Sequence, residues 1–263
     1  MRSVKEFAAA KREGRKIVMV TAYDSWSARL LAESPVDCLL VGDSVMMVMH
    51  GQQDTLGATV ELMALHTSAV AKSAAGKFIV ADLPFLAARK RVAHALDAAA
   101  QLMRAGAHAV KIEGVRGHAD VIAHLVESGI PVMGHLGLQP QSVHALGGYT
   151  VQARGEKDAE RLREDVASLE KAGAFAVVLE CIPRKLARTV TAETSMPTIG
   201  IGAGTGCDGQ VLVLHDLLGF NPEFRPKFVR RFASGAKVVK DGVAKFSRAV
   251  RAGTFPAGKE SFE

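Results

Sequence analysis

FIVADLP (residues 78–84) is a short apolar run that carries a carboxylate, Asp82, near its end. A run of this length and bulk is typical of a strand buried in a parallel sheet. Four other runs carry a polar or charged residue in the same place: CLLVGD (38–43), AVKIEG (109–114), PVMGHLG (131–137) and AVVLECI (176–182). A carboxylate at the end of an apolar strand is costly to bury alone. We therefore expect the ends of these five strands to meet in one polar site.

The spacing of the runs predicts an α/β barrel. Successive runs lie roughly 25–45 residues apart, which leaves room for one crossover helix between parallel strands. Three further strand-like segments, at 16–23, 198–202 and 211–215, bring the total to eight. Eight strand–helix units favour a closed (β/α)8 TIM barrel, typically about 250 residues, over an open sheet. For this chain of 263 residues we predict a single barrel domain over 1–263, with C-terminal helices at about 224–251 and a short tail.

Composition argues against several classes of protein. No apolar run approaches the ~20 residues that a membrane span requires, and the charged N-terminus is unlike a signal peptide. The three cysteines follow no metal or disulfide pattern, which favours a reducing cytoplasm. The net charge of +6 is concentrated at 225–251, where nine basic residues and one acid give +8. Because no aromatic stacking pattern accompanies it, this charge indicates a solvated helix face or a surface for a polyanion, not a nucleic-acid site.

Three of the strand-end acids are candidate ligands for a hard divalent cation. Asp43, Asp82 and Glu113 supply carboxylate oxygens, and Mg²⁺ takes few protein carboxylates while keeping positions open for substrate and water. Zinc is not indicated, because no His/Cys spacing fits it. Each acid taken singly could instead cap the turn that follows its strand. All three together at strand ends favour the metal site.

Three other residues are candidates for binding and catalysis. Lys111 lies two residues from Glu113, so both side chains point to the same face of their strand. Lys111 is either half of a structural ion pair or a cation that neutralises a substrate carboxylate or oxyanion. Glu180 is the candidate general base, with an ion pair to Arg184 as the structural alternative. His135 is either a hydrogen-bonded core residue or a substrate contact.

Together the motifs resemble the ketopantoate hydroxymethyltransferase family. The matching segments follow the family order and cover roughly residues 4–256. The two long ones are IPVMGHLGLQPQSVHALGGYTVQAR (130–154) and PTIGIGAGTGCDGQVLVLHDLLG (197–219). The shorter ones are VTAYDSWSARL (20–30), LLVGDS (39–44), VADLPF (80–85), AVKIEG (109–114) and GAFAVVLECIP (173–183).

This resemblance implies a fold, a reaction and an assembly. The fold is a (β/α)8 barrel of the phosphoenolpyruvate/pyruvate type. The reaction is hydroxymethyl transfer from 5,10-methylenetetrahydrofolate to 3-methyl-2-oxobutanoate, which gives 2-dehydropantoate through an enolate that Mg²⁺ stabilises. The pathway is pantothenate and coenzyme A biosynthesis. The family also implies a homo-oligomer, typically a decamer, and we expect neither nucleic acid nor membrane as a partner.

The resemblance assigns roles residue by residue. The GDS and DLPF aspartates, which bind metal and substrate, fall on Asp43 and Asp82. The K-x-E pair falls on Lys111, for substrate, and Glu113, for metal, and the catalytic base falls on Glu180. The substrate-contacting serine falls on Ser44, while His135 is a further candidate contact.

The chain departs from the family pattern beside the site. The pattern GDSLGMVVxGxDSTLPVT stands here as GDSVMMVMHGQQDTLGAT (42–59), and the Gly-Ser-Tyr after DLPF stands as Leu-Ala-Ala (86–88). These changes bear on loop conformation and substrate fit. Two other functions remain open: a Mg²⁺-dependent lyase or aldolase acting on a 2-oxo acid without folate, and a non-catalytic barrel that serves as an assembly module.

Overall fold

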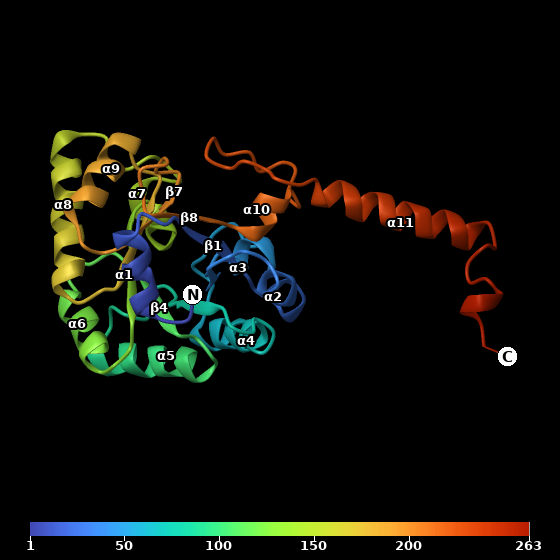
Figure 1. The fold of residues 1–263 in the computed structure, drawn as a ribbon, viewed down its shortest axis with the longest axis horizontal. Coiled ribbons are helices and arrows are strands. Elements are labelled where there is room, and N and C mark those ends of the chain that lie inside the picture. Colours follow the sequence, from blue (N-terminus) through green and yellow to red (C-terminus); the bar gives the residue numbers. More distant parts are fainter. Residues whose placement is uncertain (263) are drawn as a thin grey trace. The chain divides into compact units, whose positions relative to one another are not determined.

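The computed structural model describes residues 1–262 and has two compact units, residues 1–213 and the residues from Leu214 onward. The first unit is a closed barrel of eight strands in the order β1 to β8, each parallel to its neighbours (Figure 1), which confirms the predicted fold class. The prediction that 1–263 is a single domain stays a prediction. The strands are β1 (Ile17–Thr21), β2 (Cys38–Val41), β3 (Phe78–Asp82), β4 (Ala109–Glu113), β5 (Val132–Gly137), β6 (Ala176–Glu180), β7 (Thr198–Ile201) and β8 (Gly209–Leu212).

Helices surround the barrel, as Figure 1 shows. Most follow the predicted alternation: α2 (Ser25–Ala32), α4 (Val60–Ala71), α5 (Val92–Arg104), α6 (Ala119–Glu127), α8 (Glu156–Lys171) and α9 (Arg184–Glu193). Three short elements lie in the connections after β2 and β5: α3 (Val45–Val48), η1 (Pro140–Ser142) and α7 (Val143–Leu146). These two connections are the long ones of the sequence, and both follow the carboxyl ends of strands.

The strand period of two divides the apolar side chains into two cores. Alternate residues such as Met19, Val80 and Val178 fill the barrel, where they pack in one buried cluster. The residues between them, such as Ile79 and Val177, pack in a second cluster with the surrounding helices. The aliphatic interior agrees with the low aromatic content of the chain.

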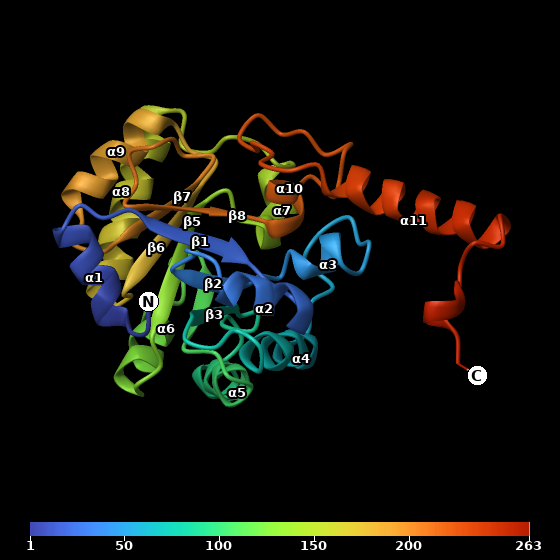
Figure 2. The same ribbon diagram turned by 45° about the vertical axis from the view of Figure 1, so that its right-hand side comes forward.

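A helix that the sequence did not lead us to expect closes the amino-terminal end of the barrel. This helix, α1 (Val4–Arg12), places Phe7 in edge contact with Phe78 and Phe175. The centroid of the Phe7 ring lies 5.2 Å from the centroid of each of these two rings. Phe78 begins β3 and Phe175 immediately precedes β6. α1 therefore covers the starts of the strands (Figure 2), opposite the carboxyl ends where the predicted site lies.

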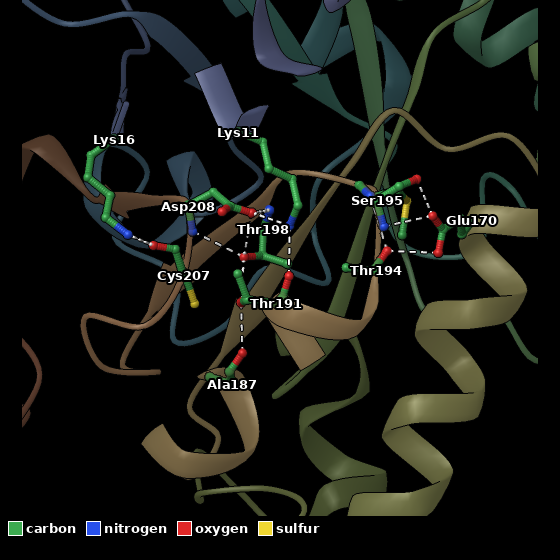
Figure 3. Close-up of polar contacts among 11 residues, drawn as sticks. Lys11, Lys16, Glu170, Ala187, Thr191, Thr194, Ser195, Thr198, Cys207 and Asp208 are labelled. Carbon is green, nitrogen blue, oxygen red and sulfur yellow. Dashed lines mark hydrogen bonds and ion pairs between the residues drawn. The ribbon is translucent and has the colours of Figure 1, made fainter. Parts of the chain in front are cut away.

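Polar contacts tie the last two strands at this same end (Figure 3). Asp208 precedes β8, and its Oδ2 accepts hydrogen bonds from Lys11 Nζ at 2.8 Å and from the backbone N of Thr198, the first residue of β7, at 2.9 Å. Thr198 Oγ1 also lies 2.8 Å from Thr191 Oγ1 of α9. Polar groups at the amino-terminal face of a barrel stabilise the fold and do not take part in catalysis.

The predicted last strand was placed too far along the chain. We expected 211–215, but β8 spans Gly209–Leu212 and Leu214 already begins a helix. The reason is close packing against β1, because a Cβ at Gly209 would lie 2.5 Å from the carbonyl oxygen of Ile17. Only glycine fits there, so the strand begins inside a glycine-rich segment that reads as a loop.

The second unit holds α10 (Leu214–Leu218), α11 (Gly235–Arg251) and a 3-10 turn, η2 (Gly258–Glu260). The predicted helices at about 224–251 are wrong for 224–234, which is not helical. Pro222 and Pro226 lack the N–H that a helix needs, and Arg231 Nη2 donates instead to the carbonyl oxygens of Asn221, Pro222 and Phe224. Among the described residues, no helix is long and apolar enough to cross a membrane.

Candidate active site

The strand period that fills the barrel also gathers the predicted polar residues. Asp82, Lys111, Glu113, His135 and Glu180 each stand two or four residues beyond an inward apolar residue of their own strand. They therefore form a polar layer above the apolar interior, at the carboxyl ends of β3 to β6. All but Glu180 are buried, and the Glu180 side chain keeps 15% of its surface exposed.

The first half of this layer is centred on Asp82. Its Oδ1 lies 3.2 Å from Lys111 Nζ, and its Oδ2 accepts a 3.0 Å hydrogen bond from the backbone N of Asp43. Asp43 lies just after β2, where its Oδ2 accepts a 2.7 Å bond from Gln141 Nε2. Neither aspartate side chain caps a helix, so the capping alternative does not describe them.

The second half is centred on His135. Its Nδ1 lies 3.3 Å from Glu113 Oε1 and 3.2 Å from Lys111 Nζ, while its Nε2 lies 3.1 Å from Glu180 Oε2. The partner of Glu180 is thus this histidine, not the Arg184 that the sequence offered as the alternative. Glu113 is further held through Oε2, which accepts from the backbone N of Gln141 at 3.0 Å.

Ser44 is held at the edge of the same layer. Its Oγ lies 2.8 Å from the hydroxyl of Tyr23, a fully buried residue just after β1. The preceding Gly42 permits this close packing, because a Cβ there would stand 2.8 Å from Ser44 Oγ and 3.6 Å from Asp82 Oδ2. The structure therefore brings together every residue that the sequence predicted for the site.

The electrostatics of the layer follow from burying several charges together. Burial raises the pKa of Asp43, and the neighbouring Asp82 and Glu113 raise it further, to about 8. Burial also raises the pKa of Asp82, although Lys111 opposes this. For Lys111 the effect of burial is outweighed by Asp82, Glu113 and Asp43, which together raise its pKa. The lysine is therefore charged and the two aspartates resist losing their protons.

His135 is balanced between cations and anions. Burial and Lys111 lower its pKa, but the Glu113 and Glu180 carboxylates outweigh them and raise it to about 9. A raised pKa is expected for a histidine placed between two carboxylates, because they stabilise its charged form. In either protonation state of the ring, Nε2 is the nitrogen that faces Glu180. In the neutral ring, Nδ1 accepts a hydrogen bond from Lys111.

A cation fits this site. Asp82 Oδ1 and Glu113 Oε1 are buried without a well-aligned hydrogen bond, and the site gathers more carboxylates than lysines. No three His, Cys, Asp or Glu side chains in residues 1–262 are already grouped as a metal site. A hard ion would therefore need oxygen atoms from substrate and water beside the protein ligands, as Mg²⁺ prefers. The metal roles of Asp43, Asp82 and Glu113 remain predictions.

Two residues of the site escaped prediction. Gln141 donates hydrogen bonds to Asp43 and Glu113. Its Nε2 also donates to the carbonyl oxygen of Leu83 at 3.0 Å. Tyr23 holds Ser44. Both stand in quoted motifs, QPQS after β5 and TAYD after β1, but an uncharged residue in a loop carries little chemical signal by itself.

One departure from the family pattern has a visible structural consequence. Leu86, where the pattern has glycine, adopts a left-handed backbone with φ of 61°. This conformation favours glycine, so the leucine strains the turn between β3 and α5. The turn is held by a hydrogen bond from the backbone N of Ala87 to the carbonyl oxygen of Pro84 at 2.9 Å.

The fold is similar to that of solved barrel enzymes, among them a member of the PEP mutase/isocitrate lyase superfamily. One solved member of that superfamily, 2,3-dimethylmalate lyase, superposes with a TM-score of 0.63 at 17% identity, covering 100% of this chain and 92% of that chain. Phosphonopyruvate hydrolase, solved with oxalate and Mg²⁺, gives 0.63 at 13% identity, covering 99% and 93%. At these identities the likeness shows the fold.

The chain belongs to the ketopantoate hydroxymethyltransferase family, whose model matches residues 2–258. It is 49% identical to the 3-methyl-2-oxobutanoate hydroxymethyltransferase of Bdellovibrio bacteriovorus over 262 residues, covering 100% of both chains. It is also 48% identical to the enzyme of that name from Legionella pneumophila over 260 residues, covering 98% of this chain and 99% of the relative. The family suggested by the motifs is confirmed.

Proposed function

We propose that this protein transfers a hydroxymethyl group from 5,10-methylenetetrahydrofolate to 3-methyl-2-oxobutanoate and forms 2-dehydropantoate for pantothenate biosynthesis. The observation that carries this proposal is the polar layer itself. It brings together two buried aspartates, a charged lysine and a partly exposed glutamate at the carboxyl ends of the barrel strands. The chain that carries them belongs to the ketopantoate hydroxymethyltransferase family.

Asp43, Asp82 and Glu113 are the residues that would hold Mg²⁺. When bound, Mg²⁺ would withdraw charge from the keto oxygen of the oxo acid and so acidify C3. Lys111, charged and directed into the layer, neutralises the substrate carboxylate. Ser44 donates its hydroxyl to the same substrate from a position that Tyr23 fixes.

Glu180 is the base that takes the proton from C3. A positioned general base contributes about 10²–10⁴-fold to the rate. His135 Nε2 faces Oε2 of Glu180 at 3.1 Å, which leaves Oε1 for the substrate proton. C3 then bonds to the methylene carbon of the folate as one of its two C–N bonds breaks, and the departing nitrogen takes up the proton removed from C3. Water replaces the second nitrogen, supplying the hydroxyl of the hydroxymethyl product and a proton to that nitrogen, and tetrahydrofolate leaves.

The wider setting is part of the same proposal. We infer a cytoplasmic enzyme that assembles as a homo-oligomer, a decamer by family resemblance. The support is the family match over nearly the whole chain and, for the assembly, the apolar side chains that α11 leaves exposed.

Hydrogen exchange at C3 tests the proposal. The purified chain would be incubated with Mg²⁺ and 3-methyl-2-oxobutanoate in D₂O, with and without methylenetetrahydrofolate, and followed by NMR. We expect exchange without folate and 2-dehydropantoate only with it. Exchange without transfer from any folate form would indicate the lyase. A chain that binds neither Mg²⁺ nor the oxo acid would be the assembly module.

A further inference from the structure

A pair of histidines lies outside the polar layer, on the connection that follows β2. His50 comes two residues after α3, and His66 lies on α4. Their Nε2 atoms are 3.1 Å apart, and their rings meet edge to face with centroids 5.3 Å apart. His50 is exposed and His66 is half-buried, so solvent reaches the pair. No step of the proposed reaction uses either residue.

The hydrogen bonding of His66 fixes which nitrogen is available. Its Nδ1 lies 2.6 Å from the carbonyl oxygen of Tyr23. A carbonyl oxygen only accepts, so Nδ1 carries the hydrogen and the lone pair of the neutral ring is on Nε2, facing His50. Histidines that bind metals have this arrangement, with the second ring nitrogen donating to a backbone carbonyl or a carboxylate.

We propose that His50 and His66 form a binding site for a borderline-soft divalent cation such as Zn²⁺ or Cu²⁺. Zn–N bonds of ~2.0–2.1 Å at a tetrahedral angle separate two nitrogens by about 3.3 Å. The observed 3.1 Å therefore needs only a small opening and a turn of the rings toward the ion. His50 supplies its lone pair by carrying its ring hydrogen on Nδ1, and water fills the remaining positions.

This site is distinct in chemistry from the carboxylate layer. Imidazole nitrogen suits Zn²⁺, Cu²⁺ and Ni²⁺, whereas Mg²⁺ takes oxygen. Through His50 and His66, a bound ion would link two parts of the chain. One is the segment 44–50, which begins with Ser44, and the other is α4, where His66 contacts Tyr23. The site therefore couples a transition metal to the loop next to the polar layer.

Metal binding to the full chain tests the site. With Mg²⁺ in large excess to occupy the carboxylates, one equivalent of Cu²⁺ would be added and its electron paramagnetic resonance recorded, with Zn²⁺ as competitor. We expect hyperfine coupling to two imidazole nitrogens, and displacement of Cu²⁺ only by Zn²⁺ in large excess, because Cu²⁺ binds such sites more tightly. Two substitutions remove one ligand each, and each keeps one of the local hydrogen bonds. In His50→Gln the amide nitrogen replaces Nε2, and in His66→Asn it replaces Nδ1 and still donates to Tyr23.

Each substitution is expected to weaken Cu²⁺ binding at least about tenfold, because one of two protein ligands is lost. His124→Gln, an exposed histidine on α6, is the matched control and should bind as the unmodified chain does. Zn²⁺ should also slow amide hydrogen exchange in residues 45–50 of the unmodified chain but not of His50→Gln. Unchanged Cu²⁺ affinity in His50→Gln, or a Cu²⁺ spectrum without coupling to imidazole nitrogen, would overturn the proposal.

Discussion

At the scale of single residues, Glu113 and Glu180 face the same imidazole but differ in what else they touch. Glu113 is buried, and its second oxygen accepts a hydrogen bond from the Gln141 backbone. Glu180 is partly exposed and contacts His135 through Oε2. Of the two, only Glu180 combines an oriented carboxylate with access for a substrate. The geometry therefore favours Glu180 over Glu113 for the proposed role of base.

Replacing Glu180 by Gln tests this distinction. The substitution keeps the size of the side chain but removes the proton acceptor, so C3 exchange of 3-methyl-2-oxobutanoate should slow at least about tenfold. Mg²⁺ and oxo-acid binding, measured by calorimetry, should stay within about twofold because Glu180 holds neither. Glu164→Gln, on the exposed face of α8, is the control. Exchange at the normal rate in Glu180→Gln would remove this residue as the base.

Mg²⁺ binding should depend on pH through Asp43. Its pKa is raised to about 8, so below that pH the ion must displace a proton before it can bind the carboxylate. We expect Mg²⁺ affinity to rise about tenfold per pH unit up to about pH 8 and then level off. Calorimetry in two buffers of different ionisation enthalpy would count the protons released. Mg²⁺ affinity that is constant between pH 6 and 9 would contradict this, and Asp43→Asn should lower the number of protons released, with any remainder coming from Asp82, whose pKa is also raised.

The charged residues of the site could be predicted from sequence, but their uncharged partners could not. A carboxylate or lysine at the end of a buried strand stands out because burying it alone is costly. Gln141 and Tyr23 carry no such penalty, and each is placed by a fold that brings together loops after β1, β2 and β5. His135 was left between two roles because its partners, Glu113 and Glu180, lie on neighbouring strands.

At the scale of elements, the turn after β3 carries strain at Leu86. A non-glycine residue in the left-handed region costs about 1–2 kcal/mol, whereas glycine costs roughly 0.5–1 kcal/mol in lost chain entropy. Leu86→Gly should therefore raise the free energy of unfolding by up to about 1 kcal/mol. Urea denaturation would measure the change, with Leu30→Gly on α2 as the opposite case, since glycine destabilises a helix. A loss of stability in Leu86→Gly would show that the leucine contacts outweigh the strain.

The closing strands offer a second prediction at this scale. Asp208→Ala removes the acceptor for Lys11 Nζ and for the backbone N of Thr198, a fully buried residue. The free energy of unfolding should fall by about 1–3 kcal/mol, the usual cost of leaving a buried donor unpaired. C3 exchange per folded molecule should not change, because this contact lies at the opposite end of the barrel. Asp97→Ala, exposed on α5, should change stability by less than about 0.5 kcal/mol.

At the scale of the whole molecule, periodicity and spacing sufficed for the barrel because each of eight strands carries its own apolar run. The exceptions were elements set by contacts distant in sequence. The start of β8 depends on the backbone of Ile17, and α1 depends on Phe7 meeting Phe78 and Phe175.

The proposed assembly leads to the last prediction. Val239, Val243, Phe246 and Val250 recur every three or four residues, so they share one face of α11, and all four are exposed. An exposed apolar face of this length marks an interaction surface, and a homo-oligomer supplies a second copy of the chain to cover it. Val243→Asp should therefore lower the assembly mass measured by light scattering, because burying the carboxylate without a partner is unfavourable. Lys245→Asp, which puts the same charge on the opposite face, should leave the mass unchanged. Circular dichroism would confirm that both variants are folded, and an unaltered mass in Val243→Asp would exclude this face from the assembly.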